Sequence, residues 1–406
     1  MSQQAQVAIV GGGLVGAALA LLLAQDARLR PEQIVLLEPA PPMPPGPGSA
    51  IGLRVSAISP ANRARFERLG VWQRLDSARI ATYERMLVWH ESVPPDSPDV
   101  LRFDAAEAGA ADLGCIVENN ALQAALLAAC VARGVVVRQQ ALQSLRVDDA
   151  GAWLGLPDAT LRAELVVGAD GANSAARQML QMPAAQHDYG QRAVVATVRG
   201  ERTHGGAARQ RFLSTGPLAL LPLPDGACSI VWSAAEPLAN ELLGLDAAQF
   251  SQRLTAASAG VLGVLQLESA RAAFPLRRLA AQRYVRERVA LVGDAAHVIH
   301  PLAGQGVNQG LEDAAALTAH LAARPARESV GALAALRRYE RERRAGNALV
   351  GGVVDGLDWL FTRPEGLTSW AARFGLAQVA HSKLARRFLV GQAAAQPSGR
   401  RSRGAG

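Results

Sequence analysis

Cysteine is scarce in this chain, and its scarcity excludes two classes of protein. The 406 residues include three cysteines, Cys115, Cys130 and Cys228. They are too few and too far apart for a disulfide framework or a cysteine-rich metal site. We therefore expect the reducing cytoplasm as the compartment.

Lysine and aromatic residues are also rare, which argues against a nucleic-acid partner. Lys383 is the only lysine, so scattered arginines carry almost all of the positive charge behind the formal net charge of +7 at pH 7. Aromatic residues make up 4% of the chain, whereas nucleic-acid binding favours basic residues gathered on one face or interleaved with aromatics. We expect no nucleic-acid partner, and an anionic membrane surface suits this charge at least as well.

One uncharged stretch, residues 7–24, has the length of a membrane span. Three consecutive glycines interrupt it and no basic region precedes it, so neither a membrane helix nor a signal peptide fits. We interpret it as a strand over residues 7–10, a tight turn, and a helix over residues 17–25. Half of the residues are hydrophobic, which excludes a disordered chain, and at roughly 150 residues per domain the length predicts two to three domains or one large α/β unit.

A glycine-rich turn joins this strand to this helix. Gly11, Gly13 and Gly16 fit the pattern G-x-G-x-x-G, in which the glycines permit the tight turn, the approach of a pyrophosphate and close helix–strand packing. A second apolar strand over residues 34–37 ends in Glu38, about 20 residues further on, where a carboxylate can accept hydrogen bonds from ribose hydroxyls. The pattern predicts a dinucleotide site, which FAD and NAD fit equally at this point.

Two further apolar strands end in an aspartate beside a glycine. Residues 165–168 lead into Asp170 and Gly171, and residues 289–292 lead into Gly293 and Asp294. Such an aspartate can hold a ribose or ribityl hydroxyl while the small neighbours let a cofactor approach. Each alone is an ordinary turn, but three strand-end elements in this order favour a cofactor site. Directly after Glu38, six prolines within residues 39–48 predict a surface loop. A helix is expected over residues 62–69.

Together these motifs resemble those of the FAD-dependent aromatic hydroxylases with the para-hydroxybenzoate hydroxylase fold. Within that family, the segments at 300–308, which reads HPLAGQGVN and is followed by Gly310 and Asp313, and at 54–58, RVSAI, are similar to the motifs of the ubiquinone-biosynthesis hydroxylases. The resemblance covers about residues 7 to 389. It implies an α/β protein in which a Rossmann-like FAD-binding domain is interleaved with an antiparallel-sheet substrate domain, followed by C-terminal helices.

The resemblance also divides the chain. Residues 1–75, 105–182 and 283–345 are expected to form the FAD-binding domain, and residues 76–104 and 183–282 the substrate domain. A C-terminal helical region at 346–394 and a disordered tail at 395–406 follow.

More local expectations accompany this division. Strands are expected at 192–198 and 229–232, a helical region from 311 to about 344, and a ring-pocket lining at 218–223, for which plain sheet core is the alternative. Apolar residues at helical spacing within 350–390 would pack on the body of the protein or touch a membrane.

By the same resemblance, several residues are expected to bind FAD. Glu38 would meet the adenosine ribose, Arg54 the phosphates, and Asp294 the ribityl and pyrophosphate part. Besides these, the expected cofactor-binding residues are Gly11, Gly13, Gly16, Gln123, Asp170, Gly293, Pro301, Gly304, Gln305, Gly306, Val307 and Asn308. The last five of them, from Gly304 on, would present backbone N–H groups at a helix N-terminus to the flavin pyrimidine edge, where reduced flavin carries negative charge.

No cofactor or metal contact is assigned to three further positions, Asn120, His297 and His300. Many relatives have a basic residue at position 120, where this chain has Asn120. His297 and His300 lie three residues apart, but no Glu or Cys partner stands at metal spacing, so we expect no metal site.

The resemblance implies an enzyme, an FAD-dependent aromatic-ring monooxygenase. It would hydroxylate a polyprenylated phenol in ubiquinone biosynthesis, with FAD bound, NAD(P)H as a transient co-substrate, and O₂ reacting through a flavin C4a-hydroperoxide. The expected partners are this phenol and O₂, the inner face of a membrane in peripheral contact, and other ubiquinone-biosynthesis proteins. No catalytic residue is carried over, and the ring carbon, the choice of NADH or NADPH, the oligomeric state and the group that activates the phenol stay open.

Two alternatives remain at this stage. One is a related flavin hydroxylase for a soluble phenol, which would need a buried arginine at the ring rather than an open apolar tunnel. The other is a non-catalytic flavin-binding accessory protein of a biosynthetic complex.

Overall fold

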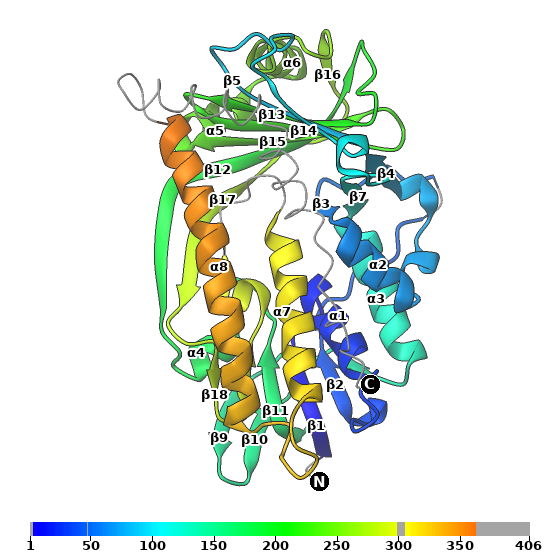
Figure 1. Ribbon diagram of the computed structural model, residues 1–406, viewed down its shortest axis with the longest axis vertical. Helices are drawn as coiled ribbons and strands as arrows, with labels where there is room; N and C mark the ends of the chain where they lie inside the picture. The colour runs from blue at the N-terminus through cyan, green and yellow to red at the C-terminus, as the bar shows by residue number, and fades with distance from the viewer. Residues whose placement is uncertain (1–2, 47, 299–304, 363–406) are drawn as a thin grey trace, which may run out of the picture.

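The computed structural model describes residues 3–46, 48–298 and 305–362 (Figure 1). Within these residues the strands form three sheets. Sheet 1 lies at the end of the molecule that holds the N-terminus, sheet 2 lies at the opposite end, and the long helix α8 (Leu333–Thr362) runs between the two ends (Figure 1). The C-terminal part of the expected helical region, residues 363–394, and the expected tail at 395–406 lie outside the described residues.

Sheet 1 is built around a parallel core. β1 (Gln3–Val10) is central, between β2 (Ile34–Leu37) and β11 (Thr160–Gly168); β8 (Val136–Arg138) pairs with β2, and β19 (Val289–Leu291) pairs with β11. Antiparallel pairing adds β9 (Ser144–Asp148), β10 (Gly151–Gly155) and β18 (Val285–Arg286). Every residue of β2 and β19 is buried, which is why these segments are continuous apolar runs rather than alternating ones.

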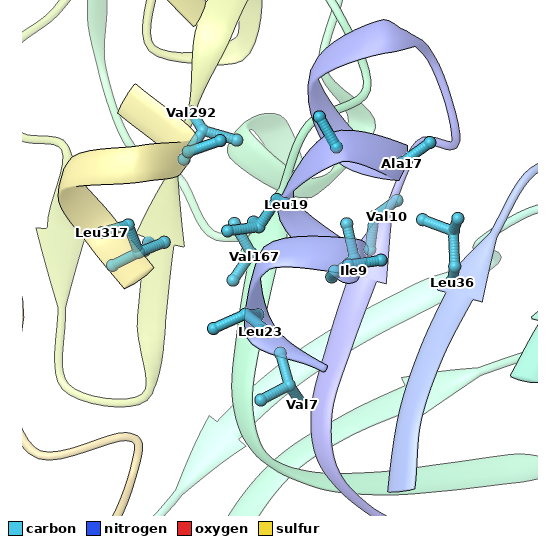
Figure 2. Packing of buried hydrophobic residues seen from close by; sticks show 14 of the residues in the cluster. Val7, Ile9, Val10, Ala17, Leu19, Leu23, Leu36, Val167, Val292 and Leu317 are labelled. Carbon is cyan, nitrogen blue, oxygen red and sulfur yellow. The ribbon is translucent and has the colours of Figure 1, made fainter. Parts of the chain in front are cut away.

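Three helices pack side by side next to this sheet. They are α1 (Leu14–Leu23), α3 (Asn119–Ala132) and α7 (Gln305–Ala322). Figure 2 shows Val7 and Ile9 of β1 against Leu19 and Leu23 of α1, all of them fully buried, with Leu317 of α7 in the same cluster. The core of this part of the molecule therefore lies between sheet 1 and the three helices.

Sheet 2 has nine strands and is antiparallel except for one pair. Its strand order is β20-β17-β12-β15-β14-β13-β5-β6, with β16 also on β12. The bounds are β5 (Arg85–His90), β6 (Leu101–Asp104), β12 (Ala184–Gly200), β13 (Ala207–Leu213), β14 (Gly216–Pro222), β15 (Cys228–Ala235), β16 (Leu265–Leu267), β17 (Ala272–Ala281) and β20 (His297–Val298). Helices α5 (Glu236–Gly244) and α6 (Ala247–Ala257) cover its outer face.

The smaller sheet 3 lies between the other two. It consists of β3 (Val55–Ile58), β7 (Gly114–Glu118) and β4 (Ile80–Tyr83), all antiparallel. The remaining helices are α2 (Pro60–Arg68) and α4 (Ala175–Met179), with short 3₁₀ turns η1 (Pro31–Gln33), η2 (Trp72–Arg74), η3 (Ser77–Arg79), η4 (Ala106–Ala108) and η5 (Gly293–Ala295).

Most of the expected elements are confirmed, and one of them is interrupted. The strands predicted at 34–37, 192–198 and 229–232 are β2 and parts of β12 and β15. The helical region predicted from 311 to about 344 consists of two helices with a break between them, since α7 ends at Ala322 and α8 begins at Leu333. Pro325 lies in the break, where it disfavours helical backbone at the residue before it, and Gly331 passes so close to Glu164 that a Cβ would lie 2.2 Å from its carbonyl oxygen.

The domain division stays a prediction, and position 346, where the C-terminal region was expected to begin, lies inside α8. Among the residues that the structure describes, no helix combines the length and the apolar composition needed to cross a membrane.

Candidate functional site

The carboxyl ends of four neighbouring parallel strands meet at one edge of sheet 1. β2, β1, β11 and β19 lie in this order, and their ends lead into Glu38, Gly11, Asp170 and Gly293. Backbone hydrogen bonds continue past the strands, from Gly11 N to Leu37 O at 2.9 Å and from Ala169 N to Val10 O at 2.8 Å. The structure therefore brings together the motifs that the sequence analysis found far apart, at the edge where open α/β sheets bind ligands.

Glycine is present at the positions of the first turn for different physical reasons. Gly11 has φ +102° and a Cβ on it would lie 2.5 Å from Ala169 O, while a Cβ on Gly16 would lie 1.9 Å from Gly11 O. Packing alone therefore requires glycine at both positions. At Gly13 a Cβ would meet no atom of the described residues within 4 Å, so the missing side chain leaves room beside the described chain.

Gly13 also stands at the N-terminus of α1. It is the N-cap residue, with φ −64°, and no side chain makes a capping hydrogen bond there. The first N–H groups of a helix need acceptors, and the helix dipole favours an anion at this end. A diphosphate fits the open side of this turn.

The peptide of Gly12 is held from both sides. Gly12 N donates to Glu38 Oε2 at 2.9 Å, and Gln123 Nε2 of α3 donates to Gly12 O at 3.0 Å. The second oxygen of Glu38 accepts from Ala40 N at 3.1 Å, which still leaves lone pairs for a ribose hydroxyl. Glu38 and Gln123, both expected to contact FAD, thus share a structural task that the sequence analysis missed, and their contact with the cofactor stays a prediction.

Asp170 has one oxygen without a partner. Its Oδ2 accepts from Ala176 N at the start of α4, at 3.0 Å, whereas Oδ1 is buried and has no hydrogen-bond partner within the described part of the chain. Buried acceptors are nearly always paired, so an orphaned carboxylate oxygen beside the glycine turn fits a hydroxyl donor from a bound cofactor.

Asp294 and Arg54 lie near each other above the next strand end. Solvent reaches the Asp294 carboxyl although protein surrounds it closely. Burial raises the pKa of Asp294, and the positive charges of His297 and Arg54 act against this rise. The exposed Arg54 guanidinium stacks over the ring of Phe274 in β17, 5.5 Å from its centroid, so Arg54 links the Gly-Asp turn to sheet 2.

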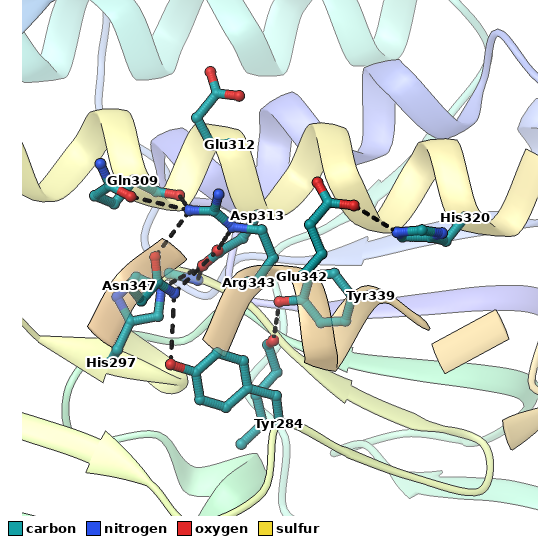
Figure 3. A network of polar contacts seen from close by, with 12 residues as sticks. Tyr284, His297, Gln309, Glu312, Asp313, His320, Tyr339, Glu342, Arg343 and Asn347 are labelled. Atoms are coloured by element: carbon teal, nitrogen blue, oxygen red, sulfur yellow. Dashed lines mark hydrogen bonds and ion pairs between the residues drawn. The ribbon is translucent and has the colours of Figure 1, made fainter. Parts of the chain in front are cut away.

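A buried polar network holds the Gly-Asp turn in place (Figure 3). Asp313 of α7 is fully buried; its Oδ2 accepts from Gly293 N at 2.9 Å and from His297 Nε2, and its Oδ1 accepts from Arg343 Nε of α8 at 2.6 Å. Burial opposes ionisation of this carboxyl, but His297 and Arg343 outweigh it and hold the pKa of Asp313 below its ordinary value. Two residues that the sequence analysis saw only as motif members, Asp313 and His297, therefore fasten the turn to two helices.

The start of α7 is tied to β3 and α2 by one side chain. Asn308 Oδ1 accepts from Ser59 N at 3.0 Å and from Asn62 Nδ2 at 2.9 Å, and its Nδ2 donates to Ala57 O at 2.8 Å. The sequence analysis expected a backbone contact with flavin at Asn308 and missed this task of its side chain. The structure orients α7 so that its N-terminal end lies toward sheet 2 (Figure 1).

The expected flavin loop is described only in part. Gln305, Gly306 and Val307 form the first turn of α7, and Pro301 and Gly304 lie outside the described residues, as does His300. The backbone contacts expected of this loop stay a prediction.

A buried ion pair that no motif indicated holds the proline-rich loop. Arg79 pairs with Glu118, and both side chains are almost fully buried. Arg79 also donates to Ser49 O at 2.7 Å, just beyond the six prolines. Since the two charged residues are 39 positions apart and belong to no pattern, only the fold reveals them.

The side chains of β14 alternate between the two faces of sheet 2. Leu218 and Leu220 are fully buried and pack against α6 on the outer face. Leu221 packs on the other side, with Ala57 of β3 and Ala81 of β4. For Leu218 and Leu220 the alternative, plain sheet core, therefore holds, because successive side chains of a strand point to opposite faces. The ring-pocket lining by the inward residues stays a prediction.

We define the inner face of sheet 2 as the side chains on the Leu221 side. Strand pairing assigns to it, in the middle of the four central strands, Ala193, Val195, Thr197, Ala208, Gln210, Phe212, Pro217, Ala219, Leu221, Ser229, Val231 and Ser233. Ala219 and Val231, which are paired, remain partly exposed, whereas Leu218 and Trp232 beside them on the outer face are buried. None of these inward positions carries a charge.

Comparisons with known proteins agree with this geometry. The family model described as FAD binding domain matches residues 4–350. The 3-demethoxyubiquinol 3-hydroxylase of Escherichia coli (strain K12) is 38% identical over 358 residues, covering 87% of this chain and 89% of the relative. The ubiquinone hydroxylase UbiL of Rhodospirillum rubrum is 36% identical over 379 residues, covering 92% and 86%.

A solved structure has the same fold. The p-nitrophenol 4-monooxygenase PnpA of Pseudomonas putida DLL-E4 superposes with a TM-score of 0.74 at 18% identity, over 96% of this chain and 97% of that one. The predicted fold class, an α/β protein of the para-hydroxybenzoate hydroxylase type, is confirmed.

The two motif glycines at positions 13 and 16 allow a matched test. Gly13→Ala should fold with a melting temperature close to that of the unchanged protein but bind FAD at least about tenfold more weakly, because its Cβ enters the room left for an anion at a helix N-terminus. Gly16→Ala should lower the yield of folded protein, since its Cβ would collide with Gly11 O. Fluorescence titration of the apoprotein with FAD, together with thermal unfolding, measures both; unchanged FAD affinity in Gly13→Ala would refute the assignment.

Two adjacent acids of α7 test the buried network. Asp313→Asn should lower the free energy of unfolding by about 3 kcal/mol or more, because it leaves Arg343 and His297 without their buried counter-charge. Glu312→Gln is the comparison: Glu312 is partly exposed, although its partner Arg65 is buried, and its loss should cost less than that of the fully buried Asp313. Urea unfolding of both variants decides, and equal losses would contradict a special role for Asp313.

Proposed function

The chain belongs to the FAD-binding flavin monooxygenases, and within them to the ubiquinone-biosynthesis hydroxylases, and we propose that it hydroxylates the aromatic ring of a polyprenylated phenol in ubiquinone biosynthesis. When bound, FAD supplies the redox chemistry: it takes two electrons from NAD(P)H and delivers one oxygen atom of O₂ to the ring, while the other leaves as water. The protein binds and orients both partners and excludes water from the reacting atoms.

In this proposal the strand-end residues hold FAD. The open turn at Gly13 and the N-terminus of α1 take the diphosphate, Glu38 accepts from the adenosine ribose, and Asp170 and Asp294 accept from hydroxyls further along the cofactor. The N-terminus of α7 lies toward the inner face of sheet 2 (Figure 1), where its dipole would stabilise negative charge on the reduced ring system. Two observations support this assignment: the open space at Gly13 and the Oδ1 of Asp170, which has no partner among the described residues.

The uncharged inner face of sheet 2 carries the substrate part of the proposal. A soluble phenolic acid would need an arginine facing the ring. Arg209 and Arg211 of β13 lie close by in sequence but point to the outer face, where Arg209 donates to His204 O at 2.9 Å and Arg211 to Ala257 O at 2.7 Å. The side chains in the middle of the inner face are neutral, and the exposed Arg54, which stacks over Phe274 beside the inward Ala193, is assigned in this proposal to the FAD phosphates. The site therefore favours a neutral, largely apolar phenol over a soluble acid.

The domain division belongs to the same proposal. Sheet 1 with α1, α3 and α7 bears the cofactor motifs, and sheet 2 bears the inner face. This arrangement supports the assignment of residues 1–75, 105–182 and 283–345 to FAD and of residues 76–104 and 183–282 to substrate.

Contact with a membrane is also proposed. A polyprenyl chain partitions into lipid, so an enzyme with this substrate has to collect it at the inner face of a membrane, by peripheral contact and together with other enzymes of the route. The expected membrane-touching segment within 350–390 extends beyond the described residues.

The proposal is tested first in cells. A strain that lacks this gene should accumulate a prenylated phenol short of one hydroxyl group, and mass spectrometry of its quinone pool would identify the carbon. Restoring the gene should restore ubiquinone. A normal quinone pool in a strain without a redundant hydroxylase would contradict the proposal.

A second test separates an enzyme from a flavin-binding accessory protein. The purified protein with FAD should oxidise NAD(P)H faster when a short-tailed prenylated phenol is added, and the product should be one oxygen atom heavier. Bound FAD that NAD(P)H never reduces in the presence of the phenol would favour the accessory role.

A further inference from the structure

Gln210 of β13 is a long polar side chain that is almost fully buried. Its side chain is only 5% exposed, and within the described residues it makes no hydrogen bond. The neighbouring Arg209 and Arg211 each donate to backbone carbonyls on the outer face, although the Nε atoms of both have no partner among the described residues. The amide atoms of Gln210 are not fully enclosed by the described residues, so they are open to a hydrogen-bonding group that is not part of the described chain.

The strand register shows where this amide points. Gln210 pairs with Ala219 of β14 and with Val88 of β5, and Ala219 pairs with Val231 of β15. Ala219 lies on the same strand face as Leu221, which contacts sheet 3, so Gln210 points to the inner face and not toward α6. Its nearest cross-strand neighbours, Ala219 and Val88, have apolar side chains that cannot bond it.

The inward side chains next to Gln210 are small or apolar. Neighbouring strands are about 5 Å apart, so a ring resting on the partly exposed Ala219 and Val231 would have one edge within reach of a side chain as long as glutamine. The inner face carries no charge near it, and two serines, Ser229 and Ser233, are the other short polar groups of β15 that point inward. Gln210 is therefore a long, directional polar group on a face whose other inward polar groups in the middle of the sheet are short hydroxyl side chains.

We propose that Gln210 is a specificity-determining residue, which hydrogen-bonds an oxygen substituent of the aromatic ring and so sets which ring carbon faces the flavin. This inference rests on the proposed function and adds the recognition group. The carboxamide suits a neutral ring oxygen: its Nε2 donates to a methoxy or quinol oxygen, and its Oε1 accepts from a phenol hydroxyl. An enzyme for an acidic phenol would need an arginine to bind the substrate carboxylate, and this chain has the neutral Gln210 on the inner face instead.

A double-mutant cycle between protein and ligand tests this contact. The holoenzyme, oxidised and without NAD(P)H, is titrated with a short-tailed prenylated phenol that carries one hydroxyl and one methoxy group, and with two analogues in which one or the other oxygen is replaced by methyl. The change in flavin absorbance reports the Kd. The variant is Gln210→Met, which keeps length and apolar volume, and the control is Gln266→Met on the exposed β16 of the same sheet.

The expected result is coupling with one of the two oxygens. The unchanged enzyme should bind the analogue that lacks that oxygen about tenfold more weakly, the effect of one hydrogen bond. Gln210→Met should bind the parent phenol about tenfold more weakly and no longer distinguish the two ligands, and it should release more hydrogen peroxide per NAD(P)H during turnover. Gln266→Met should behave as the unchanged enzyme.

The other outcomes are equally decisive. If Gln210→Met weakens all ligands by the same factor, or none of them, Gln210 makes no ring contact and the inference is wrong, while the proposed function stands. If the unchanged enzyme binds and hydroxylates no prenylated phenol, the proposed function fails and the inference with it. Should Gln210→Met not fold, Gln210→Asn, which keeps the amide but shortens its reach, is put through the same cycle.

Discussion

The parallel pairing of β2, β1, β11 and β19 is the constraint on which the site depends. It forces four strand ends into one narrow edge, and the chain there must turn away without side chains. Gly11 and Gly16 are glycines because a Cβ would collide with neighbouring backbone. The N–H groups of the crowded turns then donate to carboxylates, Gly12 N to Glu38 and Gly293 N to Asp313, which holds the turns in place at the edge where a cofactor has to approach.

Buried polar groups in this protein fall into two kinds that differ in their partners. The first kind is satisfied internally: Asp313 by His297 and Arg343, and Glu118 by Arg79. The second kind has a buried atom without a partner among the described residues, as in Asp170 Oδ1. Internal satisfaction is typical of groups that stabilise the fold, whereas a buried group left without a partner at a concave edge is what ligand recognition requires.

Sheet 2 shows how strand alternation keeps structure and recognition apart. Its outward side chains, such as Leu218, Leu220 and Arg211, pack on helices or bond to backbone, and its inward ones are small, apolar or neutral. The same strands can therefore hold a rigid core on one face and offer a floor for an aromatic ring on the other. A shift of one residue in register would exchange the two sets.

The sequence by itself determined the features that depend on residues close together in the chain. Strand, glycine turn and helix at the N-terminus, the acid after the second strand, and the two later strand-end motifs were all predictable, because local pattern and turn chemistry specify them. The family resemblance then predicted the α/β fold and the FAD and phenol chemistry.

Only the tertiary structure decided the contacts between distant residues. Asn308 meets Ser59 across 249 positions and Arg343 meets Asp313 across 30, and the break between α7 and α8 depends on the packing of Gly331 against β11. Which residues of β13 and β14 face the ring could not be predicted either. A period-two pattern shows that successive side chains point to opposite faces, but not which face is the inner one. Only the positions of the helices and of sheet 3 assign Gln210 to the inner face and Arg211 to the outer face.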